Sequence, residues 1–210
     1  MIKTHTTFLI IGLLTIILAC GTALGQIEFG FQAGINSDFV KTNGFKSGVK
    51  ANQGGSLGYH AGIFGRVHFE SRWSVISEIQ FIRKGVRAIY PHLPNRQRTN
   101  FEYFDIAVLP AYHLTDRWIL EAGPSFDIQT RLFYSDSQAF PRSLVQFGLN
   151  AGVRLKISDG LSCSLKYYHA LTPFETYTSH GETPQGTIGI SQYFYRTLQL
   201  SLAYTLTKAQ

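Results

Sequence analysis

Two aspartates are the residues of this sequence best placed for acid–base chemistry. A turn at Asp116 would fold the chain so that Asp105 and Asp127 lie opposite one another on neighbouring strands. Two carboxyl groups held that close could exchange protons with a substrate. They could equally be neutralised by inner cations such as Lys84 or Arg131, and we favour this interpretation because charges enclosed in a protein must be paired.

A second motif matches the nucleophile signature of many serine hydrolases. Residues 54–58 read Gly-Gly-Ser-Leu-Gly, which fits the pattern G-x-S-x-G. That signature works where a strand precedes the serine and a helix follows it. Here a polar segment precedes Ser56 and a strand pattern follows it, so we predict a flexible loop and no nucleophile.

The histidines form no recognisable metal or catalytic motif. Neither the HExxH nor the CxxC spacing occurs, so we predict no metal site, no cofactor and no catalytic residues. His180, which shares a long polar segment with Glu175 and Glu182, is the one histidine that merits a test, although a solvated side chain is the simpler explanation. The histidines beyond the N-terminal segment are dispersed along the chain: His60, His68, His92, His113, His169 and His180.

The N-terminal segment has the features of a secretory signal peptide. A basic start is followed by an apolar run over residues 8–19, which is too short to span a membrane. Ala23 and Gly25 fit the −3 and −1 positions of a cleavage site. We therefore predict a signal peptide over residues 1–25 and a single mature domain over 26–210.

An alternative reading of the same segment is a lipoprotein signal, which would place a lipid on Cys20. Removal of Cys20 with the signal peptide would leave Cys163 alone, and a single cysteine cannot form an internal disulfide. The cellular compartment must therefore be inferred from the N-terminus and not from cysteine pairing.

Composition narrows the class of protein. The 210 residues suit one domain. Charged residues make up 15% of the chain, below the usual quarter of a soluble domain, while the apolar fraction is an ordinary 44%. The net charge is +6, but no basic helix or Lys/Arg cluster accompanies it, so we expect no nucleic-acid partner.

Eight segments alternate apolar and polar residues with a period of two, which is the signature of strands. In the last segment Leu198, Leu200 and Leu202 alternate with Gln199 and Ser201. The segments are about ten to fifteen residues long, which exceeds typical soluble strands and is enough for a tilted transmembrane strand. They cover residues 27–36, 58–69, 73–86, 101–114, 118–132, 144–156, 161–171 and 194–206.

The connections between these segments alternate in length. Short turns lie near residues 71, 116 and 159. The long connections cover 37–57, 87–100, 133–143 and 172–193. Short turns at one end, long loops at the other and an even strand count are typical of outer-membrane barrels. We predict an all-β fold: a closed antiparallel up-and-down transmembrane β-barrel of about eight strands, with both termini at the short-turn end.

Ionic residues avoid the apolar face of the predicted strands. A Lys or Arg that faces lipid at mid-membrane costs about 2–4 kcal/mol. Only Arg83, Glu102 and Arg196 fall on the apolar face, and all three lie near the long connections. We predict that the inner ionic residues form an ion-pair network in a polar lumen without an open pore: Glu28, Arg66, Glu78, Lys84, Asp105, Glu121, Asp127, Arg131, Arg154, Lys156 and Lys166.

Two further sets are predicted at the membrane surfaces. Aromatic residues near the strand ends would form an interface girdle: Trp73, Trp118, Tyr112 and Tyr204. Basic residues of two long connections could contact the phosphates of surface lipopolysaccharide, or could simply be solvated: Lys41, Lys46, Lys50, Arg87, Arg96 and Arg98.

Three segments of the chain resemble the porin-like outer-membrane β-barrel family, whose wider relatives include OmpA-type eight-stranded barrels. They are Phe29–Asn36, Glu78–Gly85 and Phe104–Pro110, and the resemblance extends over about residues 27–206. It implies a location in the bacterial outer membrane, contact with outer-membrane lipid, insertion by the barrel-insertion machinery and no shared catalytic residues.

These observations favour a non-enzymatic barrel with a structural, binding or assembly-partner role. One alternative is a lipid-modifying enzyme of the same architecture, which would need a Ser/His/acid site at the loop end. Another is a soluble periplasmic barrel of lipocalin type, which would have an apolar interior and would reverse the face that is buried.

Overall fold

The computed structural model describes residues 27–44, 50–51, 56–69, 72–89, 97–130, 144–180 and 188–207. The predicted signal peptide, its cleavage site and Cys20 lie outside this range. Within the described residues, no helix is long and apolar enough to cross a membrane.

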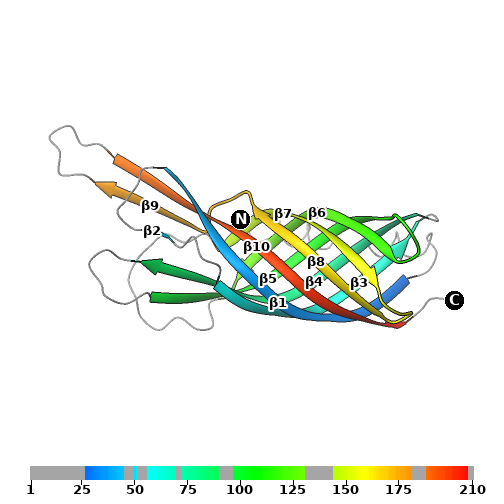
Figure 1. Cartoon of the computed structure of the whole chain (residues 1–210). Helices are drawn as coiled ribbons and strands as arrows, with labels where there is room; N and C mark the ends of the chain where they lie inside the picture. Colours follow the sequence, from blue (N-terminus) through cyan, green and yellow to red (C-terminus); the bar gives the residue numbers. More distant parts are fainter. Residues whose placement is uncertain are drawn as a thin grey trace, which may run out of the picture.

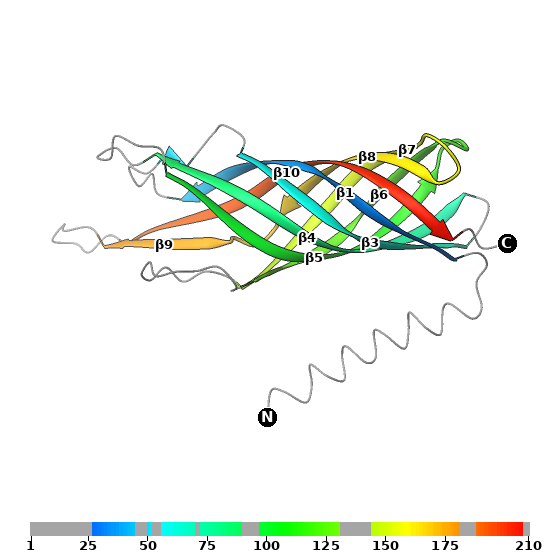
Figure 2. The same ribbon diagram turned by 90° about the horizontal axis from the view of Figure 1, so that it is seen from below.

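Eight long strands form one closed antiparallel barrel (Figures 1 and 2). Each strand pairs with its neighbours along the chain, and the first and last pair with one another to close the cylinder. The predicted closed eight-stranded barrel is thus confirmed. The barrel strands are β1 (Ile27–Gly44), β3 (Ser56–His68), β4 (Trp73–Ile89), β5 (Gln97–His113), β6 (Trp118–Gln129), β7 (Val145–Lys156), β8 (Leu161–Ala170) and β10 (Ile188–Thr207).

Two short strands extend the sheet beyond the eight. β2 (Lys50–Ala51) pairs with the end of β4, and β9 (Glu175–His180) pairs with the start of β10. In Figure 1, β9 and the start of β10 project past one end of the barrel. We call this end the loop end, and the opposite end, where β3–β4, β5–β6 and β7–β8 are joined, the short-turn end.

The long connections are shorter than the sequence pattern indicated. β1 continues to Gly44, and β9 together with the start of β10 occupies part of the predicted loop 172–193. Two paired strands satisfy their backbone hydrogen bonds wherever they run, so pairing can continue past the barrel. The outward positions of this stretch of β1 include the polar residues Ser37 and Lys41, so the apolar alternation weakens and the pattern did not reveal the extension.

Side-chain hydroxyls stabilise two of the short turns. The Thr115 hydroxyl accepts hydrogen bonds from the backbone N–H groups of Arg117 and Trp118, at 3.3 and 3.0 Å. The Ser158 hydroxyl accepts one from Leu161 N–H at 3.3 Å. Such local bonds fix tight reversals, and they set the register of the strands that follow.

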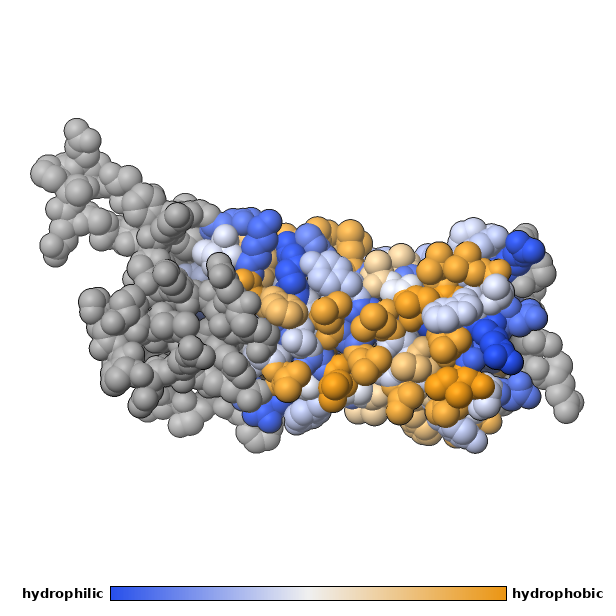
Figure 3. Space-filling model, in the orientation of Figure 1, coloured by the Kyte–Doolittle hydropathy of each residue, from blue (hydrophilic) through white to orange (hydrophobic). Residues whose placement is uncertain are grey.

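The two faces of each strand differ in the way lipid contact requires. In β10, Leu198, Leu200 and Leu202 are 41–56% exposed, whereas Gln199 and Ser201 are at most 2% exposed. Figure 3 shows apolar side chains gathered over the body of the barrel. A soluble lipocalin-like barrel would place its apolar residues inside, so this alternative does not fit the structure.

The β5–β6 pairing contains one interruption. The ladder runs as far as Ala107 opposite Ser125 and resumes at Ala111 opposite Glu121, with the same register on both sides. Pro110 and Pro124 fall in this interval, and proline has no N–H to donate to a ladder. Both prolines are exposed on the outer face, so the inner face of the wall keeps its alternation.

Candidate functional site

The alternation of the strands delivers a dense set of polar side chains to the lumen. Eight residues of the predicted ion-pair network are at most 3% exposed: Arg66, Glu78, Lys84, Asp105, Glu121, Asp127, Arg154 and Lys166. Glu28 and Lys156 are half-buried near the short-turn end, and Arg131 lies outside the described residues. We therefore take the lumen as the candidate site.

Four ionic residues meet at the middle of the lumen, and we call them the ionic hub: Glu78, Glu121, Arg154 and Lys166. The Arg154 guanidinium donates to Glu121 at 2.9 Å and to Glu78 at 3.0 Å. The Lys166 ammonium donates to the other oxygen of Glu78. All four side chains are fully buried. Charges removed from water to this extent persist only when they are paired, and here each has a partner.

The hub spans the full width of the barrel. Counted around the closed sheet, β4 and β8 are four strands apart in either direction, so they form opposite walls. Glu78 on β4 nevertheless contacts Lys166 on β8. An ion pair between opposite walls places side chains across the lumen at that level, in keeping with the narrow interior of an eight-stranded barrel.

A second level of the lumen is crossed by Lys84, whose ammonium lies among aromatic rings. We call Lys84, Asp127, Tyr103, Tyr168 and Tyr195 the lysine cage. The ammonium is 2.5 Å from Asp127 and lies over the rings of Tyr103, Tyr168 and Tyr195, at 5.4, 3.9 and 5.5 Å from their centroids. Cation–π contacts of this kind strengthen when water is excluded. The contact from Lys84 on β4 to Tyr168 on β8 again joins opposite walls.

The register places Asp105 directly opposite Asp127. The two carboxylates are held by different donors, since Asp105 accepts from the Gln80 amide at 2.9 Å and Asp127 from Lys84. Both are at most 2% exposed, so no substrate can reach them. The geometry fits charge neutralisation better than acid–base catalysis.

Aromatic side chains fill the lumen toward the loop end. Phe174 stacks on Tyr195 at 4.3 Å between centroids, and it lies 6.0 Å from Phe101 and 6.3 Å from Tyr193. Tyr103 on β5 meets Tyr195 on the opposite strand β10 at 6.2 Å. These rings form an apolar layer between the lysine cage and the loops.

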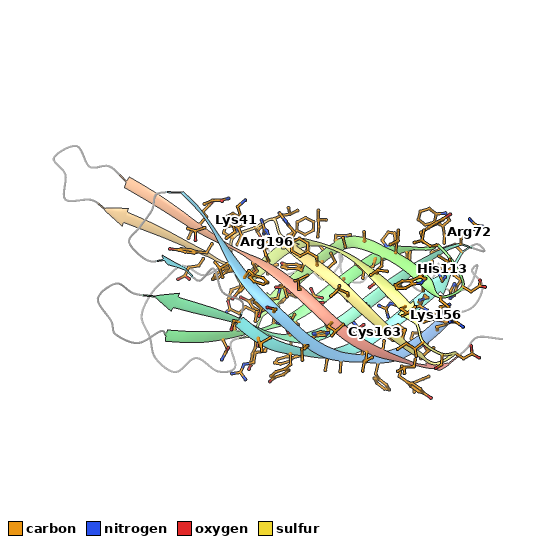
Figure 4. All side chains as sticks on the ribbon, viewed as in Figure 1. Lys41, Arg72, His113, Lys156, Cys163 and Arg196 are labelled. Carbon is orange, nitrogen blue, oxygen red and sulfur yellow. The ribbon has the colours of Figure 1, made fainter. Side chains whose placement is uncertain are left out.

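At the short-turn end the lumen opens into a polar mouth. Arg66 donates to Glu28 at 2.8 Å, and His68 lies 3.6 Å from the other oxygen of Glu28. Lys156 lines the same mouth, which holds a pocket of about 430 Å³. Figure 4 shows Arg72, His113 and Lys156 gathered at this end of the barrel.

Glycines on the inner face leave room for the largest of these side chains. A Cβ atom on Gly148 would lie 2.2 Å from the Tyr168 ring, and one on Gly34 would lie 2.8 Å from the His60 ring. Neither distance is possible for real atoms, so the two rings occupy space that only glycine provides. Small residues opposite large ones are what a narrow barrel interior requires.

The structure adds lumen residues that the sequence pattern did not single out. Asp38, predicted in a loop, points inward from the longer β1 and accepts hydrogen bonds from Asn36, Thr197 and the Gly85 N–H at 2.9–3.0 Å. Gln32, Asn36 and Asp38 are separated by even numbers of residues and lie on the same, inner face of β1. Extending the predicted strand past residue 36 would therefore have placed Asp38 in the lumen.

A buried Ser–His contact also lies in the lumen. The His60 imidazole and the Ser201 hydroxyl are 2.8 Å apart, and both residues are at most 2% exposed. Within the described residues the second ring nitrogen of His60 has no hydrogen-bond partner, so no acid orients it. A nucleophilic serine needs both an oriented base and access to substrate, and this pair has neither.

The remaining candidate residues from the sequence are Ser56 and His180. Ser56 of the G-x-S-x-G match begins strand β3 and is fully buried, so the prediction of a flexible loop is wrong at residues 56–58. β3 pairs here with the extended β1, which orders the segment. His180 lies in β9 but its side chain, like His92 and Glu182, is outside the described part of the chain. No group of three His, Cys, Asp or Glu side chains in the described ranges could hold a metal ion.

The basic residues predicted in two loops belong largely to strands, which corrects that prediction. Lys41 lies in β1 and is exposed, Lys50 lies in β2, and Arg87 pairs with Arg98 across β4 and β5. Strand pairing beyond the barrel accounts for the difference. Side-chain positions are described only for Lys41 among these, and Lys46 and Arg96 lie outside the described residues.

Aromatic residues of the predicted girdle lie on the outer face near the short-turn end. Trp73, Trp118 and Tyr204 are 45–56% exposed. Trp73 packs against Tyr112 with 4.9 Å between ring centroids. Rings with one polar edge suit the boundary between lipid tails and headgroups.

Known proteins share this architecture. OprG from Pseudomonas aeruginosa superposes with a TM-score of 0.50 at 12% identity, over 86% of this chain and 94% of that chain. Ail of Yersinia pestis, solved with the heparin analogue sucrose octasulfate, gives 0.45 at 16% identity over 86% and 99%. Neisserial surface protein A gives 0.45 at 14% identity over 84% and 96%. No curated protein matches the chain.

The family comparison is more specific than these structural likenesses. The family model described as outer membrane protein beta-barrel domain matches residues 22–175, which is most of the chain. Together with the lipid-facing outer surface and the closed eight-stranded barrel, this match shows that the chain belongs to the outer membrane protein beta-barrel domain family and is a β-barrel of the bacterial outer membrane.

Proposed function

We propose that this outer-membrane protein is a non-enzymatic barrel with a sealed lumen, which acts through its surfaces in a structural, binding or assembly role and conducts no solute. The observation that carries the proposal is contact between opposite walls at two levels: Glu78 with Lys166 in the ionic hub, and Lys84 with Tyr168 and Tyr103 with Tyr195 in the lysine cage. Any solute path would have to separate the contacts at both levels.

The absence of enzymatic activity is supported by the burial of the reactive groups. The paired carboxyls and the Ser201–His60 pair are enclosed in the lumen, and the ionic hub commits its charges to one another. A lipid-modifying site would instead need reactive side chains that a lipid can reach. A second Ser–His contact, Ser74 with His113 at 3.1 Å, lies at the short-turn end, but its serine is 1% exposed and so is closed to a lipid as well.

The proposal includes the route of the protein to the outer membrane and its contact with lipopolysaccharide there. We expect residues 1–25 to act as a secretory signal and the barrel-insertion machinery to assemble the mature chain. Basic residues at the loop end would contact phosphates of lipopolysaccharide. Lys41 supports this part of the proposal, because it is exposed on the outer face at that end.

Conductance in planar lipid bilayers tests the sealed lumen. We expect the refolded protein to give no steady single-channel current. A variant without the hub (Glu78→Ala, Glu121→Ala, Arg154→Ala and Lys166→Ala) should also be silent, because the lysine cage still closes a separate level. Heat-modifiable gel mobility would show that each protein is folded.

The matched variant removes the upper level instead. Lys84→Ala, Asp127→Ala, Tyr103→Ala, Tyr168→Ala and Tyr195→Ala leave the hub in place, so this protein should be silent too. Only a protein that lacks both levels and also the aromatic layer at Phe101, Phe174 and Tyr193 should conduct. Steady current from the unaltered protein would overturn the proposal.

A further inference from the structure

Three neighbouring strands carry a basic side chain on the outer face near the loop end: Lys41 on β1, Arg196 on β10 and His169 on β8. Arg196 pairs directly with His169 on one side and with Phe39 on the other. Lys41 lies two residues beyond Phe39 and so shares its face. Figure 4 shows Lys41 and Arg196 close together at this end. We call these three residues the outer cationic cluster.

The cluster has no compensating acid among the described residues. No carboxylate lies within 4.0 Å of Lys41, Arg196 or His169 there. Lys41 and Arg196 are both close enough to act electrostatically on the His169 ring. Desolvation and the two neighbouring cations disfavour a proton on the His169 imidazole, so Lys41 and Arg196 supply the positive charge of the cluster, and this charge attracts an anion.

Backbone contacts fix the arginine of the cluster against the barrel wall. One nitrogen of the Arg196 guanidinium donates to the carbonyl oxygens of Ala170 and Tyr195, at 2.9 and 2.8 Å. A guanidinium has five N–H donors in a planar fork, so the remaining donors can still meet a ligand. Such preorganisation lowers the entropic cost of binding.

The depth of the cluster matches the far edge of the apolar band. Tyr204 of the girdle pairs with Phe31. Lys41 lies ten residues further along β1 than Phe31, which is roughly 33 Å of strand and about 25 Å of depth at a tilt near 40°. The apolar band of such barrels is about 25 Å tall, so Lys41 lies at the level of the headgroups. Arg196 pairs with Phe39 and therefore lies about 5 Å nearer the acyl chains, a distance that its long side chain can span.

Apolar side chains continue directly from the cluster toward mid-membrane. Leu198 is two residues below Arg196 on β10, and Tyr167 is two residues below His169 on β8; both are 41% exposed. Leu200 and Leu165 follow on the same two strands, at 46% and 49%. An anion bound by the cluster could therefore carry acyl chains that lie along this wall.

We propose that Lys41, Arg196 and His169 bind a phosphate of the outer-leaflet glycolipid, the phosphorylated lipid A part of lipopolysaccharide. The inference deepens the lipid contact in the proposed function and rests on its orientation, with the loop end outward. Arginine and lysine form the short, charge-assisted hydrogen bonds that phosphate prefers. At the outer leaflet, the lipid that presents phosphate at this depth is the glycolipid.

Native mass spectrometry of the folded protein in detergent tests the inference. Lipid A with two phosphates, lipid A without phosphate and phosphatidylglycerol are added separately, and the bound fraction is measured. We expect the unaltered protein to prefer phosphorylated lipid A. Lys41→Gln with Arg196→Gln should weaken that binding about tenfold or more, since two charge-assisted contacts are removed.

The matched control removes two exposed cations from the opposite end, by Arg72→Gln with Arg117→Gln. Its affinity should stay within about twofold of the unaltered protein, because these positions lie at the other membrane surface. Heat-modifiable mobility shows whether both variants fold, and His169→Gln alone, which breaks none of the hydrogen bonds of Arg196, gives a milder second test.

Three outcomes would overturn the inference: equal binding by the unaltered protein and the Lys41/Arg196 variant, an equal loss in the control, or equal binding of lipid A without phosphate. Equal or tighter binding of phosphatidylglycerol would show that the chosen lipid is wrong. Failure here is separate from failure of the sealed lumen, because a conducting barrel could still bind lipid A at its outer face.

Discussion

At the scale of single residues, Glu78 is the side chain on which the ionic hub depends. It receives Arg154 on one oxygen and Lys166 on the other, and it is fully buried. Glu28 makes a similar contact with Arg66 at 2.8 Å, but its side chain is 19% exposed at the mouth. The two glutamates therefore differ in solvation more than in partner type.

We predict that Glu78→Gln lowers the free energy of unfolding by about 3 kcal/mol or more, because two buried cations lose their shared carboxylate. Glu28→Gln should cost less, about 1–2 kcal/mol, because the Gln carbonyl oxygen can still accept from the buried Arg66 guanidinium and position 28 is itself partly open to water at the mouth. Urea-induced unfolding from lipid vesicles, followed by tryptophan fluorescence, measures both. Equal losses would show that the hub is no more desolvated than the mouth.

At the scale of elements, each strand separates a lipid-facing from a lumen-facing row. β10 shows this most clearly, with exposed Leu200 beside Ser201, which is 1% exposed and bonded to His60. The cost of a charge on the outer row depends on its depth in the membrane. Leu200 lies near mid-band, and Leu206 lies beyond the girdle residue Tyr204, close to the short-turn end.

Leu200→Arg should therefore destabilise the folded barrel by about 2–4 kcal/mol, whereas Leu206→Arg should cost about 0–1 kcal/mol. Both leucines are exposed on the same strand and face, so depth is the main difference between them. The same urea titration in vesicles reports the two values. If both substitutions cost the same, the outer row does not face lipid as described.

At the scale of the whole molecule, the two ends of the barrel are chemically different. Trp73 and Trp118, the two tryptophans of the chain, both begin strands at the short-turn end. The extended strands and the outer cationic cluster lie at the loop end. This asymmetry gives the barrel one orientation, with the loop end outward, as the short turns and termini of such barrels face the periplasm.

Tryptophan quenching in vesicles of brominated lipid checks the position of the barrel. Lipids brominated near the headgroup should quench both tryptophans more than lipids brominated near the acyl-chain ends, because both rings lie in the interface girdle. Trp73→Phe and Trp118→Phe separate the two signals. Stronger quenching from mid-membrane for either ring would place the band differently along the barrel axis.

The sequence alone predicted the eight strands and their sidedness, because the lipid environment acts on each residue separately. A charge that faces hydrocarbon raises the free energy of the folded barrel on any strand, so Glu78, Glu121 and Arg154 each lie on the inner face of their own strand. The alternation needs no knowledge of the partner strand. For that reason the inner face of β4, β6 and β7 could be read before any contact was known.

The tertiary structure decided which inner residues meet. Lys166 reaches Glu78, which is 88 residues away in sequence, and His60 reaches Ser201 at a separation of 141. These contacts depend on how the closed sheet staggers its strands and on which walls oppose one another, and a period of two carries neither piece of information. Backbone pairing of β1 with β10 and β3 also continues past residue 36, so β1 includes Asp38 although the alternation of apolar residues weakens there.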